Sequence, residues 1–325
     1  IHNDPDFVNA YLNLGFTLRR LGSSEAALRA FGKAADIDSQ NELAYYQMSE
    51  IKRLNGDVSG AIRNLKTAVS LAPEKALYHS KLGNLYYQQE NYAKAAESYR
   101  KSIESNPDDA TTHYNLAKVL LDQDKGETAL DHALKAVQLD SKEADNLYIL
   151  GKASEATGNT QSAISAYEKA LDLEPEYVSA MVNLGSIYDE QEKYDRALSY
   201  LLDAYELEPD SLAVNNNLGN VYLHSEIFEK SITHYRKAIE KKPGATLMRY
   251  NLAIAYIETD EQARAKEVLS ELIKIDPSYW DAYYKLGELL IAEGQNDAAE
   301  QILKRLLEKN PDYERRREVE NMLSA

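Results

Sequence analysis

Asparagine recurs at one spacing in the second half of the chain, where Asn183, Asn217 and Asn251 stand 34 residues apart. A carboxamide carries hydrogen-bond donors and an acceptor, so it can pair with both polar groups of a peptide unit. Asparagine is also a poor helix former, and each copy inside a helix costs on the order of several tenths of a kcal/mol against alanine. Carboxamides at a constant spacing therefore predict a row that holds an extended polypeptide by its backbone. Asn115 shares this phase, and Asn220 lies three residues after Asn217.

Tyrosine stands directly before this phase at Tyr148, Tyr250 and Tyr284. A tyrosine ring supplies a large, rigid contact area at a low cost in conformational entropy, which suits a binding surface. We expect these rings to contact a ligand. The alternative is that they bridge neighbouring structural elements, and the sequence leaves both open.

Basic side chains lie near the N-terminal end of the chain, at Arg19, Arg20 and Arg53, and acidic side chains such as Asp189 and Glu190 lie in its middle. Opposite charges at different places along a binding surface favour one orientation of a charged ligand. We therefore expect a partner segment whose acidic end lies near the three arginines.

Catalytic chemistry finds little support in the sequence. The chain has no cysteine, and its six histidines belong to no recognised catalytic or metal-binding motif. We expect His79 and His113 to be core residues, His132 and His234 to face solvent, and His224 to face the binding surface. The segment 122–126 resembles a calcium loop but lacks the final glutamate ligand. We predict no enzyme activity, no cofactor and no metal site.

The composition excludes several classes of partner. The 325 residues include 37 basic and 53 acidic side chains, giving a net charge of −16, and this balance argues against binding to nucleic acid or an anionic membrane. The longest apolar run, 252–257, is far too short for membrane insertion. We expect a soluble protein and lean towards a bacterial one, of the cell envelope, periplasm or cytoplasm, since the sequence does not decide the compartment.

A period of 34 residues organises the whole chain. All eight prolines share one phase of it, as in the series Pro175, Pro209 and Pro243. Nine units follow one another without insertion or deletion, at 8–41, 42–75, 76–109, 110–143, 144–177, 178–211, 212–245, 246–279 and 280–313. A repeat of this length indicates a solenoid in which each unit buries its apolar surface against its neighbours.

Each repeat reads as a helical hairpin. Positions 4, 7, 8 and 11 form one apolar helical stripe, and positions 20, 24 and 27 form a second. Position 8 is always small and position 20 is almost always alanine, as at Gly83 and Ala95, so the two helices can approach closely. Turn residues near position 15, such as Gly22 and Gly56, separate the helices.

These positions resemble the tetratricopeptide repeat (TPR) pattern. Repeat 3 supplies its signature residues: His79, Leu82, Gly83, Tyr86, Ala95, Tyr99 and Pro107. The resemblance covers residues 8–313 and implies a right-handed superhelix whose concave groove is lined by the first helix of each repeat. It also implies that residues at position 5, such as Tyr250, point into that groove.

The asparagine row resembles the ladder that lines the TPR superhelix of O-GlcNAc transferases, where asparagine before the conserved leucine holds peptide backbones. Asn183, Asn217 and Asn251 match it, whereas Asn13 and Asn115 are isolated. The alternative is that asparagine here is only a common TPR residue. No three successive repeats supply the lysine, asparagine and arginine set of the carboxylate clamp, so we predict no binding of Hsp70 or Hsp90 tails through it.

The two ends of the array differ. Residues 314–325 read as an amphipathic capping helix, with Val319, Met322 and Leu323 facing inward. Residues 1–7 match the end of a possible preceding repeat, because Pro5 and Phe7 take its last positions; alternatively, Asp4 and Pro5 merely cap the first helix.

We predict from these patterns a non-catalytic protein–protein interaction scaffold that binds extended segments of partner proteins in its groove. One alternative is the substrate-recruiting arm of a larger, glycosyltransferase-like enzyme whose catalytic domain lies outside this chain. Self-association through the first repeat is a further possibility that the sequence leaves open.

Overall fold

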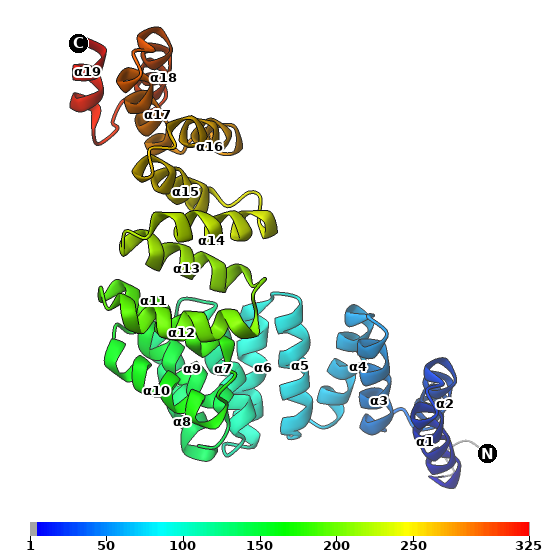
Figure 1. Ribbon diagram of the computed structural model, residues 1–325. Coiled ribbons are helices and arrows are strands. Elements are labelled where there is room, and N and C mark those ends of the chain that lie inside the picture. Colours follow the sequence, from blue (N-terminus) through cyan, green and yellow to red (C-terminus); the bar gives the residue numbers. More distant parts are fainter. Residues whose placement is uncertain (1–4, 325) are drawn as a thin grey trace. The chain divides into compact units, whose positions relative to one another are not determined.

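The computed structural model describes residues 5–324, and this part of the chain is entirely helical (Figure 1). The predicted all-α architecture is confirmed. The chain divides into two units, residues 1–174 and 175–325. The helices of the first unit are α1 (Pro5–Arg20), α2 (Ser24–Ile37), α3 (Glu42–Leu54), α4 (Val58–Leu71), α5 (Ala76–Gln88), α6 (Tyr92–Ser105), α7 (Ala110–Leu121), α8 (Gly126–Leu139), α9 (Ala144–Ala156) and α10 (Thr160–Leu173). Those of the second unit are α11 (Val178–Glu190), α12 (Tyr194–Leu207), α13 (Leu212–His224), α14 (Phe228–Lys241), α15 (Thr246–Glu258), α16 (Gln262–Ile275), α17 (Trp280–Ala292), α18 (Asn296–Lys309) and α19 (Arg316–Ser324).

Consecutive helices pair into antiparallel hairpins, from α1 with α2 to α17 with α18. The first helix of each later repeat begins at a position that the 34-residue period marks, such as Glu42, Ala76 and Ala110. Within each unit, the second helix of a repeat also packs against the first helix of the following repeat, as α14 does against α15. Each unit is therefore a solenoid of stacked helical hairpins.

Every hairpin turn places one residue in the left-handed backbone region. Glycine does so at Gly22, Gly56, Gly158 and Gly294, with φ between 75° and 81°. In the other hairpins an acidic residue takes the same place with φ between 57° and 61°, at Glu90, Asp124, Glu192, Glu226 and Asp260. A side chain in this region costs roughly 1 kcal/mol or more, so these five turns are strained where the glycine turns are not.

The small residue at position 8 allows the two helices of a hairpin to touch. A Cβ atom built on Gly83 would lie 2.5 Å from the Tyr99 ring, and one on Gly219 would lie 2.7 Å from the Tyr235 ring. Positions 8 and 20 also meet as expected, since the buried Ser231 Oγ donates to the Gly219 carbonyl at 2.8 Å. Position 24 thus lies directly beneath position 8.

In several repeats the side chain at position 4 bonds to the end of the preceding repeat. His79 Nε2 lies 2.8 Å from the Pro73 carbonyl oxygen, and His113 Nε2 lies 3.1 Å from that of Pro107. Both imidazoles are buried, as predicted for core residues. Pro73 and Pro107 lie in the irregular segments between repeats, where no helical N–H reaches their carbonyl groups. A donating ring N–H of histidine therefore satisfies these carbonyls.

The prediction that His132 and His234 face solvent is wrong. His234 is buried, and its Nδ1 lies 2.9 Å from Asn215 Oδ1. His132 is half-buried, with its Nδ1 3.0 Å from His113 Nδ1. Burial lowers the pKa of both imidazoles, and it brings that of His234 to about 4, with Lys237 and Lys230 acting in the same direction. Position 23 is buried because it packs beside position 4 of its own hairpin.

The ends of the array match the sequence only in part. Val319 of α19 is fully buried, and Met322 and Leu323 pack against the same core, as predicted for a capping helix. At the other end, α1 begins at Pro5, while Asp4 lies outside the described residues. Leu14 of α1 is 47% exposed, whereas Leu218 at the same repeat position is fully buried.

Candidate functional site

One side of the first helices carries the side chains that the sequence singles out. We call it the first-helix face, and it comprises positions 6, 9, 12 and 13 of each repeat. Contacts between neighbouring repeats join these positions, as in the hydrogen bond that Tyr87 at position 12 donates to Asp122 at position 13 of the next repeat, at 2.9 Å. First helices also pack directly on one another, α7 on α9 and α11 on α13. The face is therefore continuous from α5 to α9 in the first unit and from α11 to α15 in the second.

The three asparagines of the row lie on neighbouring first helices of the second unit, at Asn183 in α11, Asn217 in α13 and Asn251 in α15. All three side chains are half-buried. Asn217 Nδ2 donates to the Ala213 carbonyl of its own helix at 2.9 Å. Equal positions on packed helices bring the row together in space.

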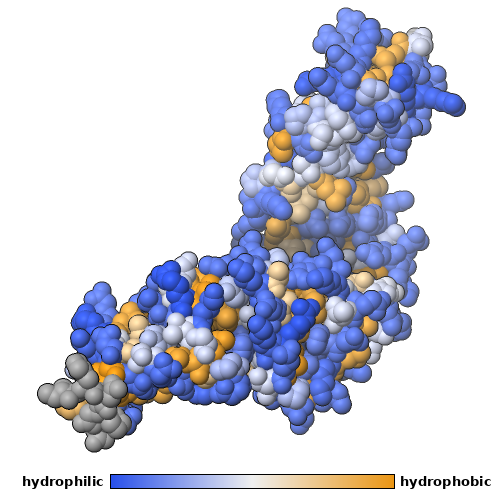
Figure 2. Space-filling model, turned by 180° about the vertical axis from the view of Figure 1, so that it is seen from behind, coloured by the Kyte–Doolittle hydropathy of each residue, from blue (hydrophilic) through white to orange (hydrophobic). Residues whose placement is uncertain are grey.

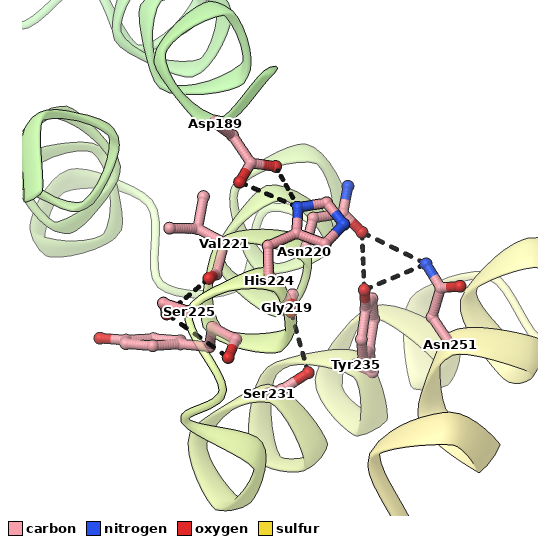
Figure 3. A network of polar contacts seen from close by, with 10 residues as sticks. Asp189, Gly219, Asn220, Val221, His224, Ser225, Ser231, Tyr235 and Asn251 are labelled. Carbon is pink, nitrogen blue, oxygen red and sulfur yellow. Dashed lines mark hydrogen bonds and ion pairs between the residues drawn. The ribbon is translucent and has the colours of Figure 1, made fainter. Parts of the chain in front are cut away.

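A buried tyrosine organises part of this row (Figure 3). The Tyr235 hydroxyl donates to Asn220 Oδ1 at 2.7 Å, and Asn251 Nδ2 donates to the same hydroxyl at 3.1 Å. Asn251 Nδ2 also lies 3.5 Å from Asn220 Oδ1. Burial raises the pKa of Tyr235, so the phenol stays neutral and keeps its proton for Asn220. We call Asn220, Tyr235 and Asn251 the Tyr235 site.

The Tyr235 site presents groups of opposite polarity. Its internal hydrogen bonds use the carbonyl of Asn220 and the amino group of Asn251. The amino group of Asn220 and the carbonyl of Asn251 point away from the Tyr235 hydroxyl (Figure 3). A fixed donor beside a fixed acceptor is what a peptide unit, with its C=O and N–H, requires.

An acidic residue with a histidine partner flanks the Tyr235 site. His224 Nδ1 lies 3.0 Å from both carboxylate oxygens of Asp189, which joins α13 to α11 (Figure 3). The Asp189 side chain is 9% exposed and that of His224 is 50% exposed. His224 is therefore accessible on the first-helix face, as expected from the sequence, and Asp189 places a negative charge below it.

The predicted tyrosines pack mostly against their neighbours. The Tyr250 and Tyr279 ring centroids lie 5.4 Å apart, and burial raises the pKa of Tyr250 to about 12. Tyr284 is 4% exposed, and its hydroxyl donates to Glu318 of the capping helix at 2.6 Å. Tyr148 is half-buried, 5.6 Å from the Tyr167 ring. The burial of Tyr284 leaves its ring too covered to contact a ligand.

The three arginines lie on the first unit in different surroundings. Arg19 donates through Nη1 to Gln47, which is buried at position 6 of the second repeat. Arg53 pairs with Glu50 of its own helix at 3.4 Å. Arg20 is exposed. Arg19 and Arg53 both lie near the Tyr46 hydroxyl, since their charges lower its pKa against the raising effect of burial.

The second helices contribute a candidate side chain that the repeat pattern does not distinguish from a packing residue. Tyr235 lies on α14, at position 24, and its hydroxyl reaches the first-helix face beneath Gly219. The signal in the sequence is a tyrosine at position 24 combined with glycine at position 8 and asparagine at position 9. This combination occurs at Tyr99 and Tyr235.

Among residues 5–324, no group of three or more His, Asp or Glu side chains is placed to hold a metal ion. In the same residues, none of the helices combines the length and apolar character needed to span a membrane. Figure 2 shows a mainly hydrophilic surface with separate apolar patches on the face that it displays.

Family models match most of the chain. Tetratricopeptide repeat models match residues 8–41, 148–211, 182–246 and 263–323, and a TPR repeat model matches residues 50–90 and 83–124. The chain belongs to the tetratricopeptide repeat family. Its members serve as scaffolds for protein interaction, and this coarse assignment agrees with the stacked hairpins and with the side chains of the first-helix face.

Solved structures share the fold at low sequence identity. The C-terminal part of a TPR protein from Cytophaga hutchinsonii is 17% identical, with a TM-score of 0.58, covering 74% of this chain and 98% of that one. A TPR protein from Parabacteroides merdae is 17% identical, with a TM-score of 0.55 and coverages of 77% and 99%. PilF of Pseudomonas aeruginosa is 19% identical, with a TM-score of 0.55 and coverages of 65% and 96%. Among curated proteins, none matches the chain in sequence.

Proposed function

We propose that the second unit binds an extended segment of a partner protein and holds it by its backbone along the first-helix face. The observation that carries this proposal is the Tyr235 site, where one buried hydroxyl fixes two carboxamides in opposite senses. Asn220 then donates to a peptide carbonyl, and Asn251 accepts from a peptide N–H. Neither contact reads the side chains of the ligand.

The spacing of the helices suits an extended ligand. Packed helices lie about 8–10 Å apart, and an extended chain advances about 3.3 Å per residue. One carboxamide per repeat therefore meets the ligand about every third residue. Asn183 and Asn217 continue the row on α11 and α13, and Asn217 exchanges its bond to the Ala213 carbonyl for one to the ligand.

Side chains around the row give the ligand its further contacts. Tyr250 and Ile254 of α15 and Leu223 of α13 are half-buried, so part of each remains exposed to a partner. Asp189 and His224 add a polar contact at the edge of the Tyr235 site. In the first unit, taken by itself, Arg19, Arg20 and Arg53 favour a segment with acidic side chains.

A selection experiment tests the proposal with peptides in place of the natural partner. Peptides of about ten residues, enough to span three repeats, are selected from a displayed library on the whole protein, and their affinities are measured by calorimetry. We expect N220A/N251A to weaken selected peptides by about tenfold or more, because two backbone contacts are lost. The matched control is N296A/N321A, which removes two exposed asparagines that lie outside the first-helix face.

Thermal unfolding checks that the same variants fold. We expect them to do so, because alanine is a better helix former than the asparagine that it replaces. Equal affinities of the wild-type protein and N220A/N251A for every selected peptide contradict the proposal.

A further inference from the structure

The Tyr235 site has a counterpart four repeats earlier, in the first unit. The Tyr99 hydroxyl donates to Asn84 Oδ1 at 2.6 Å, and Tyr99 is 2% exposed beneath Gly83. Asn115 takes the repeat position of Asn251 on the neighbouring first helix, α7. We call Asn84, Tyr99 and Asn115 the Tyr99 site.

The Tyr99 site also offers a donor and an acceptor. Tyr99 holds the carbonyl of Asn84, so the amino group of this exposed residue is left to donate. Asn115 is half-buried and makes no side-chain hydrogen bond among residues 5–324, and both of its polar groups stay available. The chemistry that holds a peptide backbone is therefore present twice in the chain.

The charges beside the two sites have opposite signs. Arg53 takes the repeat position that Asp189 takes in the second unit, and Lys81 and Lys118 take those of Asn217 and Ile254. Lys118 Nζ lies 4.9 Å from the centroid of the Tyr87 ring, and neither lysine has a carboxylate partner within the described residues. A lysine without a partner is free to pair with a ligand.

The remaining charges near the Tyr99 site are already engaged. Glu50 pairs with Arg53 at 3.4 Å, and Asp122 accepts a hydrogen bond from the Tyr87 hydroxyl at 2.9 Å. On the first-helix face, repeats 1–4 carry five basic and two acidic residues, while repeats 6–9 carry one basic and four acidic. The first-helix face of repeats 1–4 is thus basic within a chain whose net charge is −16.

We propose that the Tyr99 site is a second peptide-binding site and that it takes an acidic extended segment, with Asn84 and Asn115 on the backbone and Lys81 and Lys118 on aspartate or glutamate side chains. This inference rests on the proposed function in one respect, because it assumes that paired asparagines hold a peptide backbone. Its charge preference is separate, because it depends on lysines that the second unit lacks.

Charge reversal tests the proposal. The probes are two fluorescein-labelled peptides of about ten residues, one alternating glutamate with serine and the other lysine with serine, and binding is measured by fluorescence anisotropy. We expect K81E/K118E to weaken the glutamate peptide by about tenfold, since two attractions become repulsions, and to leave the affinity for the lysine peptide unreduced. Added salt is expected to weaken binding of the glutamate peptide to the wild-type protein.

Asparagine variants separate this proposal from the previous one. N84A/N115A is expected to weaken the glutamate peptide, and N220A/N251A to leave its affinity unchanged. If N220A/N251A changes the affinity for no peptide, the proposed function of the second unit fails. The affinity of K81E/K118E for the glutamate peptide still tests the acidic preference of the Tyr99 site. Failure of the wild-type protein to bind the glutamate peptide, or equal binding by K81E/K118E, overturns the present proposal. K81Q/K118Q replaces K81E/K118E in this comparison if the reversal prevents folding.

Discussion

The Tyr99 and Tyr235 sites use the same three residue types at the same repeat positions, yet they differ in how far they are preorganised. Asn251 donates to the Tyr235 hydroxyl at 3.1 Å, whereas Asn115 makes no such bond to Tyr99. The second unit therefore closes its pair of carboxamides before a ligand arrives, and the first unit fixes only Asn84. A shared framework thus supports two surfaces that differ in order and in charge.

The hairpins that lack these sites show what the framework needs. Gly185 and Gly287 pack on Leu201 and Leu303, which fill the space beneath position 8 but carry no hydroxyl. Position 24 supports the fold in either case, and it reaches the first-helix face with a polar group only when it is tyrosine. A tyrosine at position 24 thus packs between the two helices and also supplies a hydroxyl to the first-helix face.

The largest effect is expected where both sites depend on close packing. In G83A and G219A the new methyl group overlaps the ring of Tyr99 or Tyr235, and such overpacking destabilises by about 1–3 kcal/mol. Urea unfolding is expected to show similar losses in both units. G32A is the control, because a Cβ there meets nothing within 4 Å, and it is expected to be neutral or stabilising. A harmless G219A contradicts the packing described for the second unit.

A pH dependence is expected from repeat 7, which holds the Tyr235 site, because repeat 3, which holds the Tyr99 site, has Ser98 at the position of His234. The folded-state pKa of His234 is about 4 against an ordinary value of 6.5, so the unfolded chain binds more protons between these values. Stability should therefore fall as pH is lowered from about 6.5 towards 4, by about 1–2 kcal/mol at pH 5. Urea midpoints at several pH values measure the loss. H234N should reduce the slope; an unchanged slope contradicts the burial of a neutral imidazole.

Removing the tyrosine hydroxyls compares the two sites directly. Y235F loses one donated and one accepted hydrogen bond, whereas Y99F loses one donated bond. At about 1 kcal/mol per bond, we expect Y235F to cost about twice as much stability as Y99F in urea unfolding. Equal costs would show that Asn251 does not join the site before a ligand binds.

The smallest effect concerns the hairpin turns. E192G relieves a side chain held at φ 57°, and we expect it to stabilise by about 1 kcal/mol. Q191G, one residue earlier at φ −88°, serves as the control and should destabilise. Thermal unfolding measures both variants, and a loss of stability in E192G contradicts the strain assigned to these turns.

The sequence predicts much of this fold because the same packing positions recur in nine successive repeats. Helix type, hairpin pairing and the buried Val319 of the cap follow from periodicity alone. The bonds made by Tyr99 and Tyr235 could not be predicted in the same way, because position 24 is typical of a packing residue and the direction of its hydroxyl depends on how the two helices of its own hairpin meet. The prediction for His234 is wrong for a similar reason, since its position reads as a surface one until Asn215 is placed beside it.

The most direct test of the central claim asks whether carboxamide and peptide backbone contact one another. A selected peptide and versions of it with single N-methylated peptide nitrogens are titrated into the wild-type protein and N220A/N251A by calorimetry. We predict that methylation at one position weakens binding to the wild-type protein and has little further effect in N220A/N251A, because both changes remove the same bond. An equal loss from methylation in both proteins, at every position tested, contradicts a first-helix face that holds its ligand by the backbone.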